Sequence, residues 1–346
     1  MNVVVHRSIQ RDGAPPLISV AELDSPDAAR RFALADEIGR AARDIGFFRI
    51  RDHGIDLSII EAVYDAAERF FRLRDEEKAR YYIGNSANHR GYVPFSEKGD
   101  YPDEVSRNYE AFDLGLDLPP DDPDFLSGNR LLGPNVWPEL AGFREAVSTY
   151  YRQVAELGLR ICSALELHLG LTPGAMTRHM SKPISQLRLL HYVRAKETTA
   201  RKSVNMGAHT DYECLTLLHT RNEGLQVMTP CGAWIDVPAD PAALVVNIGD
   251  MLEAWSNGAF RSTMHRVLNL KPERFSLPYF VAANHDAVIA PFPELTGSDQ
   301  TGRYPPFRAG AHLEQMLMRD FPYFRERVLG GREWSSIENP FERRTG

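Results

Sequence analysis

The sequence has few cysteines and no long hydrophobic segment. Its 346 residues include three cysteines, Cys162, Cys214 and Cys231, without a Cys-x-x-Cys spacing, so neither a disulfide framework nor a zinc–thiolate site is expected. No segment approaches the ~20 apolar residues that a membrane-spanning helix needs. Residues 1–20 also lack the apolar stretch of a secretory signal peptide. These absences predict a cytoplasmic protein with no membrane partner.

An excess of basic residues is also absent. The chain has 40 Lys and Arg against 47 Asp and Glu, a net charge of −7, whereas nucleic-acid-binding proteins usually carry a basic face. No nucleic-acid partner is therefore expected. The proportions of hydrophobic (43%) and charged (25%) residues are ordinary for a globular protein that buries a large core. Because no internal repeat or flexible linker stands out, we expect a single domain.

Helical periodicity dominates the first half of the chain. Apolar residues recur every three or four positions from Ala28 to Ile45, after Asp56, and from Glu139 to Leu169, which predicts amphipathic helices. Asp56 is a suitable N-cap for the second of them, and residues 47–50 are expected to form a strand. Residues 84–137 are rich in Gly, Pro, Asp and Asn, which predicts long loops with only short ordered pieces.

The pattern changes to short strands near Gln186. Apolar and β-branched runs separated by turn residues occur at 186–193, 215–220, 225–227, 233–237, 243–247, 260–270 and 275–283. Seven or eight short strands at close spacing predict a β-sandwich or barrel. Residues 312–324 are again expected to be helical. The predicted fold is thus mainly β, with flanking helices.

A histidine and a carboxylate lie two residues apart in His209-Thr210-Asp211, and a second histidine, His265, opens a later strand. Residues two apart on a strand project to the same side. Two imidazoles and one carboxylate on one side of a metal, with the opposite positions open, are typical of non-haem Fe(II) oxygenases. The pattern predicts an iron site built from His209, Asp211 and His265.

Other histidines fit this role less well. His312 and Glu314 repeat the His-x-carboxylate spacing, but no histidine follows them and the segment is predicted to be helical. His219 lies inside an apolar strand and is expected to be a core residue. His285 follows the last strand, and His53 precedes a glycine, so both are expected to lie in turns.

Arg274-Phe275-Ser276 favours His265 as the second histidine, because this triplet follows it closely. An arginine and a serine two apart on a strand face the same side. The guanidinium can bind a carboxylate through two hydrogen bonds, and the hydroxyl adds another donor. The alternative role for Arg274 is that of a surface arginine in an ion pair. Next to a metal site, the pair instead predicts an anchor for a 2-oxoacid.

Motifs ordered along nearly the whole chain resemble the isopenicillin N synthase-like family of Fe(II)/2-oxoglutarate-dependent oxygenases. The matching blocks are Gly46-Phe47-Phe48-Arg49-Ile50-Arg51-Asp52-His53-Gly54-Ile55, Gly91-Tyr92, Gly133-Pro134-Asn135-Val136-Trp137-Pro138, Leu190-His191-Tyr192, Gly207-Ala208-His209-Thr210-Asp211, Gly224-Leu225-Gln226-Val227, Asn247-Ile248-Gly249-Asp250, His265-Arg266-Val267 and Arg274-Phe275-Ser276. The chain departs from the family at Asp52, which is more often asparagine, and at Val193, which is often proline.

The resemblance implies a double-stranded β-helix, or jelly roll, with a helical N-terminal region and a C-terminal helix. One oxygenase domain would span residues 1–346: a helical and loop-rich region at 1–185, the jelly-roll core with the iron site at 186–285, and a C-terminal extension at 286–346. This architecture agrees with the predicted series of strands.

The resemblance also implies roles for individual residues. His209, Asp211 and His265 would bind iron, Arg274 and Ser276 would hold the distal carboxylate of 2-oxoglutarate, and Tyr192 would contact the co-substrate or substrate. By strand alternation Arg188 and Leu190 share the face of Tyr192, so they are candidates for the substrate pocket, together with Phe280.

The activity implied by the resemblance is oxidation of a small metabolite with Fe(II), 2-oxoglutarate and O2. An Fe(IV)-oxo species would hydroxylate, desaturate or cyclise the substrate, with release of succinate and CO2. The nearest alternative is an iron oxidase that does not use 2-oxoglutarate, such as isopenicillin N synthase or the ethylene-forming oxidases. A non-catalytic binding barrel and a zinc hydrolase with a His2Asp site are further alternatives, although a zinc hydrolase has no need of Arg274 and Ser276.

Overall fold

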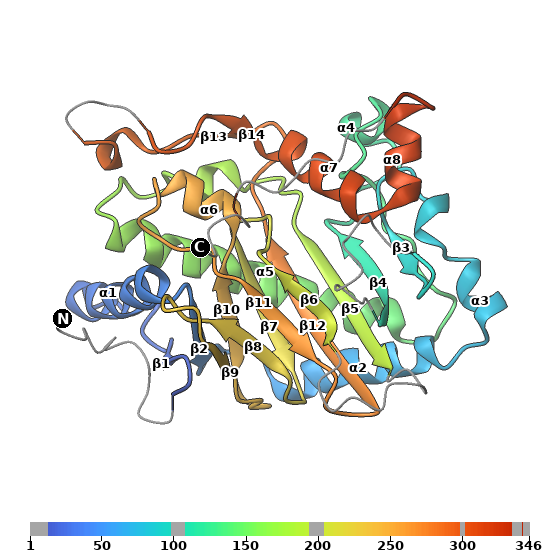
Figure 1. Cartoon of the computed structure of the whole chain (residues 1–346), viewed down its shortest axis with the longest axis horizontal. Coiled ribbons are helices and arrows are strands. Elements are labelled where there is room, and N and C mark those ends of the chain that lie inside the picture. The colour runs from blue at the N-terminus through green and yellow to red at the C-terminus, as the bar shows by residue number, and fades with distance from the viewer. Residues whose placement is uncertain (1–12, 98–107, 194–203, 298–301, 334–340, 342–346) are drawn as a thin grey trace.

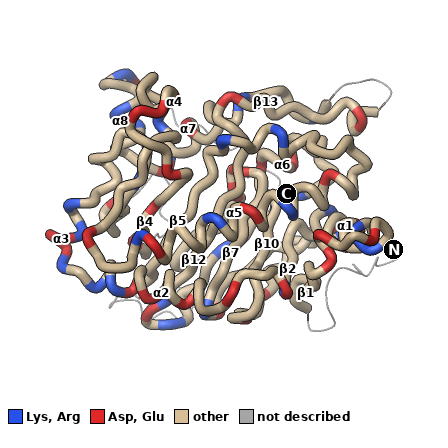
Figure 2. The backbone as a smooth tube through the Cα atoms, turned by 180° about the vertical axis from the view of Figure 1, so that it is seen from behind, with Lys and Arg blue, Asp and Glu red and all other residues tan. Residues whose placement is uncertain are grey.

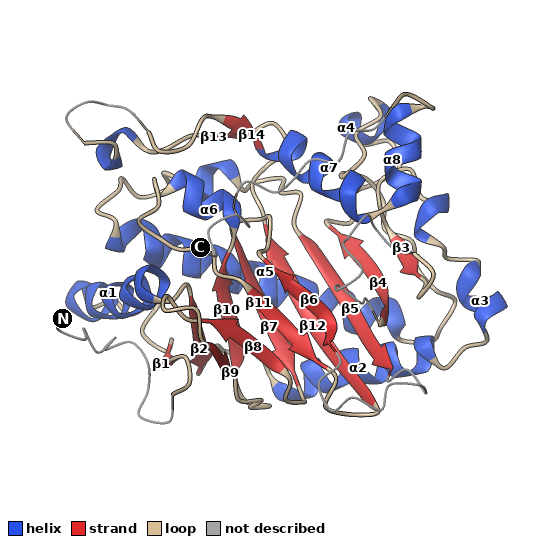
Figure 3. Ribbon diagram, in the orientation of Figure 1, coloured by secondary structure: helices blue, strands red, loops and turns tan. Residues whose placement is uncertain are grey.

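Two β-sheets form the centre of the molecule, and helices surround them (Figures 1 and 3). The computed structural model describes residues 13–97, 108–193, 204–297, 302–333 and 341. Within these residues, buried side chains from the N-terminal helices, both sheets and the C-terminal helices form one continuous hydrophobic cluster.

The larger sheet has eight strands in the order β1-β2-β10-β7-β12-β5-β4-β3. Their bounds are β1 (Leu17–Ser19), β2 (Phe47–Arg51), β10 (Leu244–Ile248), β7 (Leu215–Thr220), β12 (Glu273–Val281), β5 (Gln186–Val193), β4 (Tyr109–Gly115) and β3 (Gly91–Val93). All its pairings are antiparallel except that of β1 with β2. Strands from the N-terminal region therefore extend the sheet at both edges.

The smaller sheet has four strands in the order β6-β11-β8-β9. Its members are β6 (Val204–His209), β11 (His265–Leu268), β8 (Leu225–Met228) and β9 (Trp234–Asp236), and a separate pair joins β13 (Val288–Ile289) to β14 (Phe307–Arg308). The chain from β5 to β12 passes back and forth between the two larger sheets, and side chains of both sheets line one cavity. The predicted jelly-roll core is confirmed.

Helices lie around the two sheets, and the longest of them, α5, packs on the eight-stranded sheet. They are α1 (Ala28–Asp44), α2 (Leu57–Phe71), α3 (Asp75–Ala79), α4 (Pro123–Leu126), α5 (Phe143–His168), α6 (Asp250–Trp255), α7 (Ala309–Asp320) and α8 (Pro322–Leu329), with short 3-10 turns at Ile83–Asn85, Thr177–His179 and Pro293–Leu295. Asp27 and Asp56 accept hydrogen bonds from backbone N–H groups as N-caps of α1 and α2. Helix α5 approaches β12 closely, because a Cβ on Gly158 would lie 2.6 Å from the Val281 side chain.

The described parts of residues 84–137, namely 84–97 and 108–137, contain more regular structure than the sequence predicted. They contain β3 and β4, and every residue of β4 is buried. Strand β4 pairs with β5 along its whole length, and because successive buried residues point to opposite sides, both of its faces are covered. Such a strand lacks the alternation of apolar and polar residues that reveals a half-buried strand, and the surrounding glycine, proline and aspartate residues obscured it.

The C-terminal helix predicted at 312–324 is in fact two helices, α7 and α8 (Figure 1). Pro322 is the first residue of α8, a position that suits proline because its missing N–H has no partner there. The residue before a proline disfavours helical backbone, and Phe321 is extended. Helix α7 therefore ends at Asp320, and the chain changes direction into α8.

Charged residues of both signs are interspersed over the back of the molecule (Figure 2). Over the part of the chain that the structure describes, no helix has the length and hydropathy required to cross a bilayer.

Candidate active site

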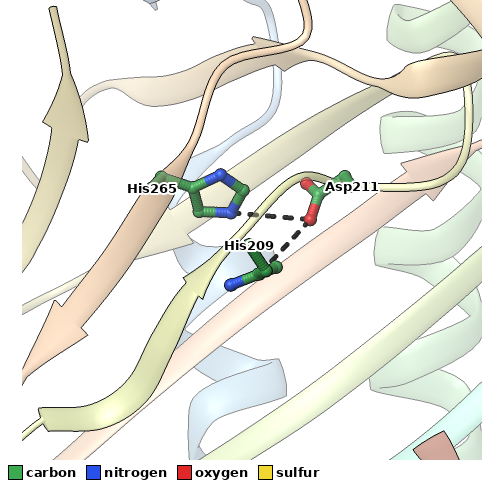
Figure 4. A group of neighbouring side chains, drawn as sticks. All are labelled: His209, Asp211 and His265. Carbon is green, nitrogen blue, oxygen red and sulfur yellow. Dashed lines mark ion pairs between the residues drawn. The ribbon is translucent and has the colours of Figure 1, made fainter. Parts of the chain in front are cut away.

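His209, Asp211 and His265 come together at the ends of two strands of the smaller sheet (Figure 4). His209 ends β6, His265 opens β11, and the two residues are direct partners in the antiparallel ladder. Oδ1 of Asp211 lies 3.6 Å from Nε2 of His209 and 3.5 Å from Nε2 of His265. One ligand atom from each residue falls within 4.8 Å of the others. The set of donors therefore fits a metal ion held on one side only.

Backbone carbonyls fix the orientation of both imidazoles. Nδ1 of His209 lies 2.8 Å from the carbonyl oxygen of Gly207, and Nδ1 of His265 lies 3.2 Å from that of Thr263. A carbonyl oxygen can only accept, so Nδ1 carries the proton in each ring. Nε2 is then left with its lone pair directed toward Asp211, as a metal ligand requires.

Asp211 is held by two neutral donors on the larger sheet. Its Oδ2 accepts hydrogen bonds from Oγ1 of Thr216 and, at 2.7 Å, from Nδ2 of Asn247, so Oδ1 is the oxygen that faces the histidines. Burial alone would raise the pKa of Asp211, but His265 and His209 outweigh it and hold the pKa well below its usual value. Conversely, burial lowers the pKa of His265, and the Asp211 carboxylate more than compensates and raises it. The carboxylate is thus ionised and aimed at the site.

Arg274 lies in the same cavity on β12 and is 2% exposed. Its Nη2 donates to Oγ1 of Thr220 at 2.9 Å, its Nη1 donates to Oγ of Ser276 at 3.3 Å, and its guanidinium lies 4.9 Å from the ring centre of Tyr192. Its Nε has no hydrogen-bond partner among the residues whose positions are described. A buried guanidinium surrounded by hydroxyl groups instead of carboxylates needs an anion from outside the chain. A carboxylate of a 2-oxoacid fits this position.

The remaining predicted residues line the same cavity. Arg188, Leu190 and Phe280 are all in its wall. The Nε and Nη2 atoms of Arg188 each lie 2.7 Å from a carboxylate oxygen of Asp113, so its charge is balanced by a two-pronged ion pair. All nine residues singled out from the sequence are thus brought together around one cavity.

Several cavity residues were not predicted from the sequence. Thr216 and Asn247 line the cavity, and Asn247 belongs to a family block without having been given a role. Thr220, on the same face of β7 as Thr216, contacts the cavity residue Arg274. Gln186, Glu213 and residues of α7 also line the cavity. Strand alternation from Tyr192 would have identified Gln186, whereas nothing short of the folded arrangement places α7 beside the site.

The competing histidines lie outside the metal cluster. His219 is held between the Tyr64 hydroxyl and the Pro241 carbonyl oxygen, and His312 is buried against the ring of Phe307. His53 stabilises a turn, because its Nδ1 accepts the backbone N–H of Ile55, although it is buried.

Comparison with known proteins identifies the family. A 2-oxoglutarate-Fe(II) type oxidoreductase of Emericella nidulans is 31% identical over 301 residues, which cover 85% of this chain and 86% of that protein. Residues 184–283 match the model of the 2OG-Fe(II) oxygenase superfamily, and residues 15–140 match the model described as non-haem dioxygenase in morphine synthesis N-terminal. The chain belongs to the 2OG-Fe(II) oxygenase superfamily.

Solved structures of oxygenases share the fold. A full-length protein of Neurospora crassa, crystallised in complex with alpha-KG, superposes with a TM-score of 0.77 at 26% identity, and the match covers 90% of this chain and 98% of that one. A 2OG-Fe(II) oxygenase family protein from Caulobacter crescentus gives 0.76 at 31% identity, with 88% and 98% covered. This oxygenase is therefore an oxidoreductase that uses Fe(II) and 2-oxoglutarate. The findings do not support an iron oxidase independent of 2-oxoglutarate.

Proposed function

We propose that His209, Asp211 and His265 bind the catalytic Fe(II) through Nε2, Oδ1 and Nε2. Support comes from the distances between these atoms and from the carbonyl groups that keep the proton on Nδ1 of each imidazole. Three ligands from one side leave the other side of the ion open to small molecules. The hydrogen bonds of Thr216 and Asn247 hold Oδ2 of Asp211 away from the ion.

Arg274, Ser276 and Tyr192 form the proposed anchor for the distal carboxylate of 2-oxoglutarate, and Thr220 orients the guanidinium. Arg274 supplies permanent positive charge in a buried position, where a charge-assisted hydrogen bond is strong. The three proposed iron ligands and Arg274 line the same cavity. This shared position is the main support for the proposed 2-oxoglutarate site. Burial raises the pKa of Tyr192, so its phenol remains protonated and able to donate.

Bound Fe(II), with 2-oxoglutarate and O2, supplies the oxidation of a substrate C–H bond, with succinate and CO2 as co-products. The contribution of the chain is to position the substrate and to exclude water. In this proposal Arg188, Leu190 and Phe280 contact the substrate, while the apolar side chains of Leu313 and Leu317 on α7 cover it. The product is hydroxylated, desaturated or cyclised.

The substrate is proposed to be a small molecule. Relatives and neighbours act on or bind compounds of this size: a homoarginine-6-hydroxylase of Arabidopsis thaliana is 33% identical over 290 residues, which cover 80% of this chain and 86% of that protein, and the Neurospora crassa protein has also been solved with thymine. We further propose that residues 1–346 form one oxygenase domain, because a single hydrophobic cluster joins its N-terminal, central and C-terminal parts.

Succinate release tests this function. The purified protein, loaded with Fe(II), is supplied with 2-oxoglutarate and O2 and screened against small metabolites for succinate and oxidised product. The expected result is substrate-stimulated succinate formation that is lost in Asp211→Ala. If the iron-loaded protein neither binds 2-oxoglutarate nor releases succinate, the proposal is wrong.

A further inference from the structure

The cavity has two distinct ends, defined by the pairing of β5 with β12. Tyr192 pairs with Arg274 at one end of this ladder, and Gln186 pairs with Phe280 at the other. Six residue steps separate Gln186 from Tyr192, which corresponds to about 20 Å between their backbone positions along the strand. The end that contains Gln186 is therefore too far from Arg274 to belong to the anchor, and it is the end beside α7 (Figure 1).

The row of residues that contains Gln186 also holds Asp211, whereas the Arg274 guanidinium reaches back from its own row to Thr220, four residues from Thr216 on β7. Across the sheet, Phe280 pairs with Thr216 and Thr216 pairs with Asn247, so these residues form one row with Gln186. Thr216 and Asn247 are the two donors to Asp211. Because neighbouring strands are about 4.8 Å apart, Gln186 lies roughly 10 Å from the residue that holds the proposed iron ligand. A small substrate can bridge this distance.

The side-chain nitrogen of Gln186 has no hydrogen-bond partner among the described residues. Gln186 is 3% exposed and lines the cavity, yet its Nε2 makes no hydrogen bond to any residue that the structure describes. A buried amide N–H without an acceptor costs about 1–3 kcal/mol, and such groups are rare in folded proteins. A carbonyl oxygen of a ligand would satisfy it.

Glu213 supplies the complementary acceptor. It is 4% exposed and lines the same cavity. The backbone N–H of the next residue, Cys214, donates to the carbonyl oxygen of Val281 at 2.8 Å, which places Glu213 at the end of the cavity that contains Phe280. The other charged groups at this end are paired: Arg188 with Asp113 at 2.7 Å, and Arg319 with Asp320 at 3.6 Å. Within the described residues, no other side chain makes a hydrogen bond or ion pair with the Glu213 carboxyl.

The walls of this end favour a flat and uncharged ligand. The Arg188 guanidinium lies 5.9 Å from the ring centre of Phe280 and 5.7 Å from that of Phe321, which leaves aromatic faces beside the polar groups. An anionic substrate would find Arg188 already neutralised by Asp113. A cationic substrate would lie beside the bound metal ion, which repels it.

We propose that the substrate presents an amide-type group, in which a carbonyl oxygen accepts from Nε2 of Gln186 and a neighbouring N–H donates to the carboxyl of Glu213. This assignment rests on the proposed function of the cavity. It names the substrate class as flat, neutral compounds with adjacent C=O and N–H groups, such as lactams and ring amides. Gln186 and Glu213 then determine specificity, and they hold the substrate in the row of residues that faces the iron ligand Asp211.

The test uses a matched set of small probes. The protein loaded with Fe(II) and 2-oxoglutarate is titrated without O2, by calorimetry, with 2-pyridone, N-methyl-2-pyridone, benzylamine and benzoate. We expect 2-pyridone to bind about tenfold or more tightly than its N-methyl analogue, because methylation leaves the Glu213 acceptor unsatisfied. The two charged probes are expected to bind more weakly than 2-pyridone.

Substitutions test which residues cause the preference for 2-pyridone over its N-methyl analogue. Glu213→Leu should abolish the difference between 2-pyridone and the N-methyl analogue, whereas Glu213→Gln, which retains an acceptor oxygen, should keep it. Gln186→Leu should weaken the binding of both 2-pyridone and N-methyl-2-pyridone, because both carry the carbonyl group. Since Gln186 lies on β5 and Glu213 in the loop after β6, this second variant tests the proposal even if Glu213→Leu fails to fold. Glu314→Gln removes a carboxylate from α7 that pairs with Arg130 outside the cavity and should change neither affinity.

Three outcomes would overturn the proposal: tighter binding of benzylamine or benzoate than of 2-pyridone, a preference that survives in Glu213→Leu, or no binding of 2-pyridone at millimolar concentration. Each leaves the proposed oxygenase function standing if 2-oxoglutarate still binds in the same titration. Loss of 2-oxoglutarate binding in the wild type would instead refute the proposed function itself.

Discussion

Arg274 lies directly opposite Tyr192 in the β5–β12 ladder, and its guanidinium lies 4.9 Å from the centre of the tyrosine ring. Opposed residues on one face of an antiparallel pair are close enough for their side chains to interact. The ring therefore limits the positions open to the guanidinium, while Thr220 and Ser276 fix two of its nitrogens.

Arg274→Ala should raise the Kd for 2-oxoglutarate by about a hundredfold, because loss of a buried charged partner costs about 2–5 kcal/mol. The Kd of Arg274→Lys should lie between those of the wild type and Arg274→Ala, since an ammonium group keeps the charge but cannot reproduce the planar fork of the guanidinium. Calorimetric titration of the metal-loaded protein measures both values. Arg266→Ala is the control, because Arg266 stacks on Trp234 in the other sheet. Unchanged affinity in Arg274→Ala would refute the anchor.

His209→Ala and Asp211→Ala should each abolish iron binding and turnover, because a site with two protein ligands is incomplete. Iron content after anaerobic loading and desalting measures the first effect, and succinate release measures the second. His285→Ala removes a histidine outside the cluster and should retain both. Full iron content in either triad variant would exclude that residue as a ligand.

Thr216 and Thr220 should have separable effects, although both lie on the inner face of β7. Thr216→Val removes a donor to Asp211 and should weaken metal binding by about 10–100-fold. Thr220→Val removes the partner of Arg274 Nη2 and should weaken 2-oxoglutarate binding while leaving metal affinity intact. Titration of each variant with metal, and then with 2-oxoglutarate, tests the separation. Equal effects of both variants on metal binding would contradict it.

His312 should make the fold sensitive to acid. Burial, helped by Arg319, lowers its pKa from 6.5 to about 4. The unfolded chain takes up a proton below pH 6.5 but the folded chain does not until about pH 4. Stability is therefore complete above pH 6.5 and falls as the pH decreases toward 4, by about 2 kcal/mol at pH 5.

The variant His312→Gln cannot titrate and should lose less stability than the wild type between pH 7 and pH 5. Urea unfolding at the two pH values measures the difference. Parallel losses in both proteins would show that another group is responsible.

The sequence was most informative where one face of an element is buried and the other is not. Helix α1 and strands β5 and β7 were predicted to within one residue, because their periodicity is clear. Strand β4 was missed because both faces are covered. Helix α6 was missed because its six residues are too few to show a period.

The same limit applies to the site. The spacing of His209 and Asp211 is local and could be read directly, and Arg274 and Ser276 share a strand face. The contacts of Thr216 and Asn247 with Asp211 depend instead on the register of β7 against β10. The presence of Gln186 and Glu213 in the lining of one cavity depends on how β5 meets the loop after β6, which no short pattern encodes.

The pairing of His209 with His265 has a consequence for metal loading. The two imidazoles are spaced by the hydrogen bonds of the β6–β11 ladder and oriented by carbonyl groups of their own strands. Neither the strand pairing nor the hydrogen bonds to the carbonyl groups involve an ion. The fold itself therefore brings the proposed ligands together, unlike a zinc finger, which acquires its geometry only on binding. Occupancy of the site is then a competition among the divalent ions that the cell supplies, decided by ligand preference and abundance instead of by folding.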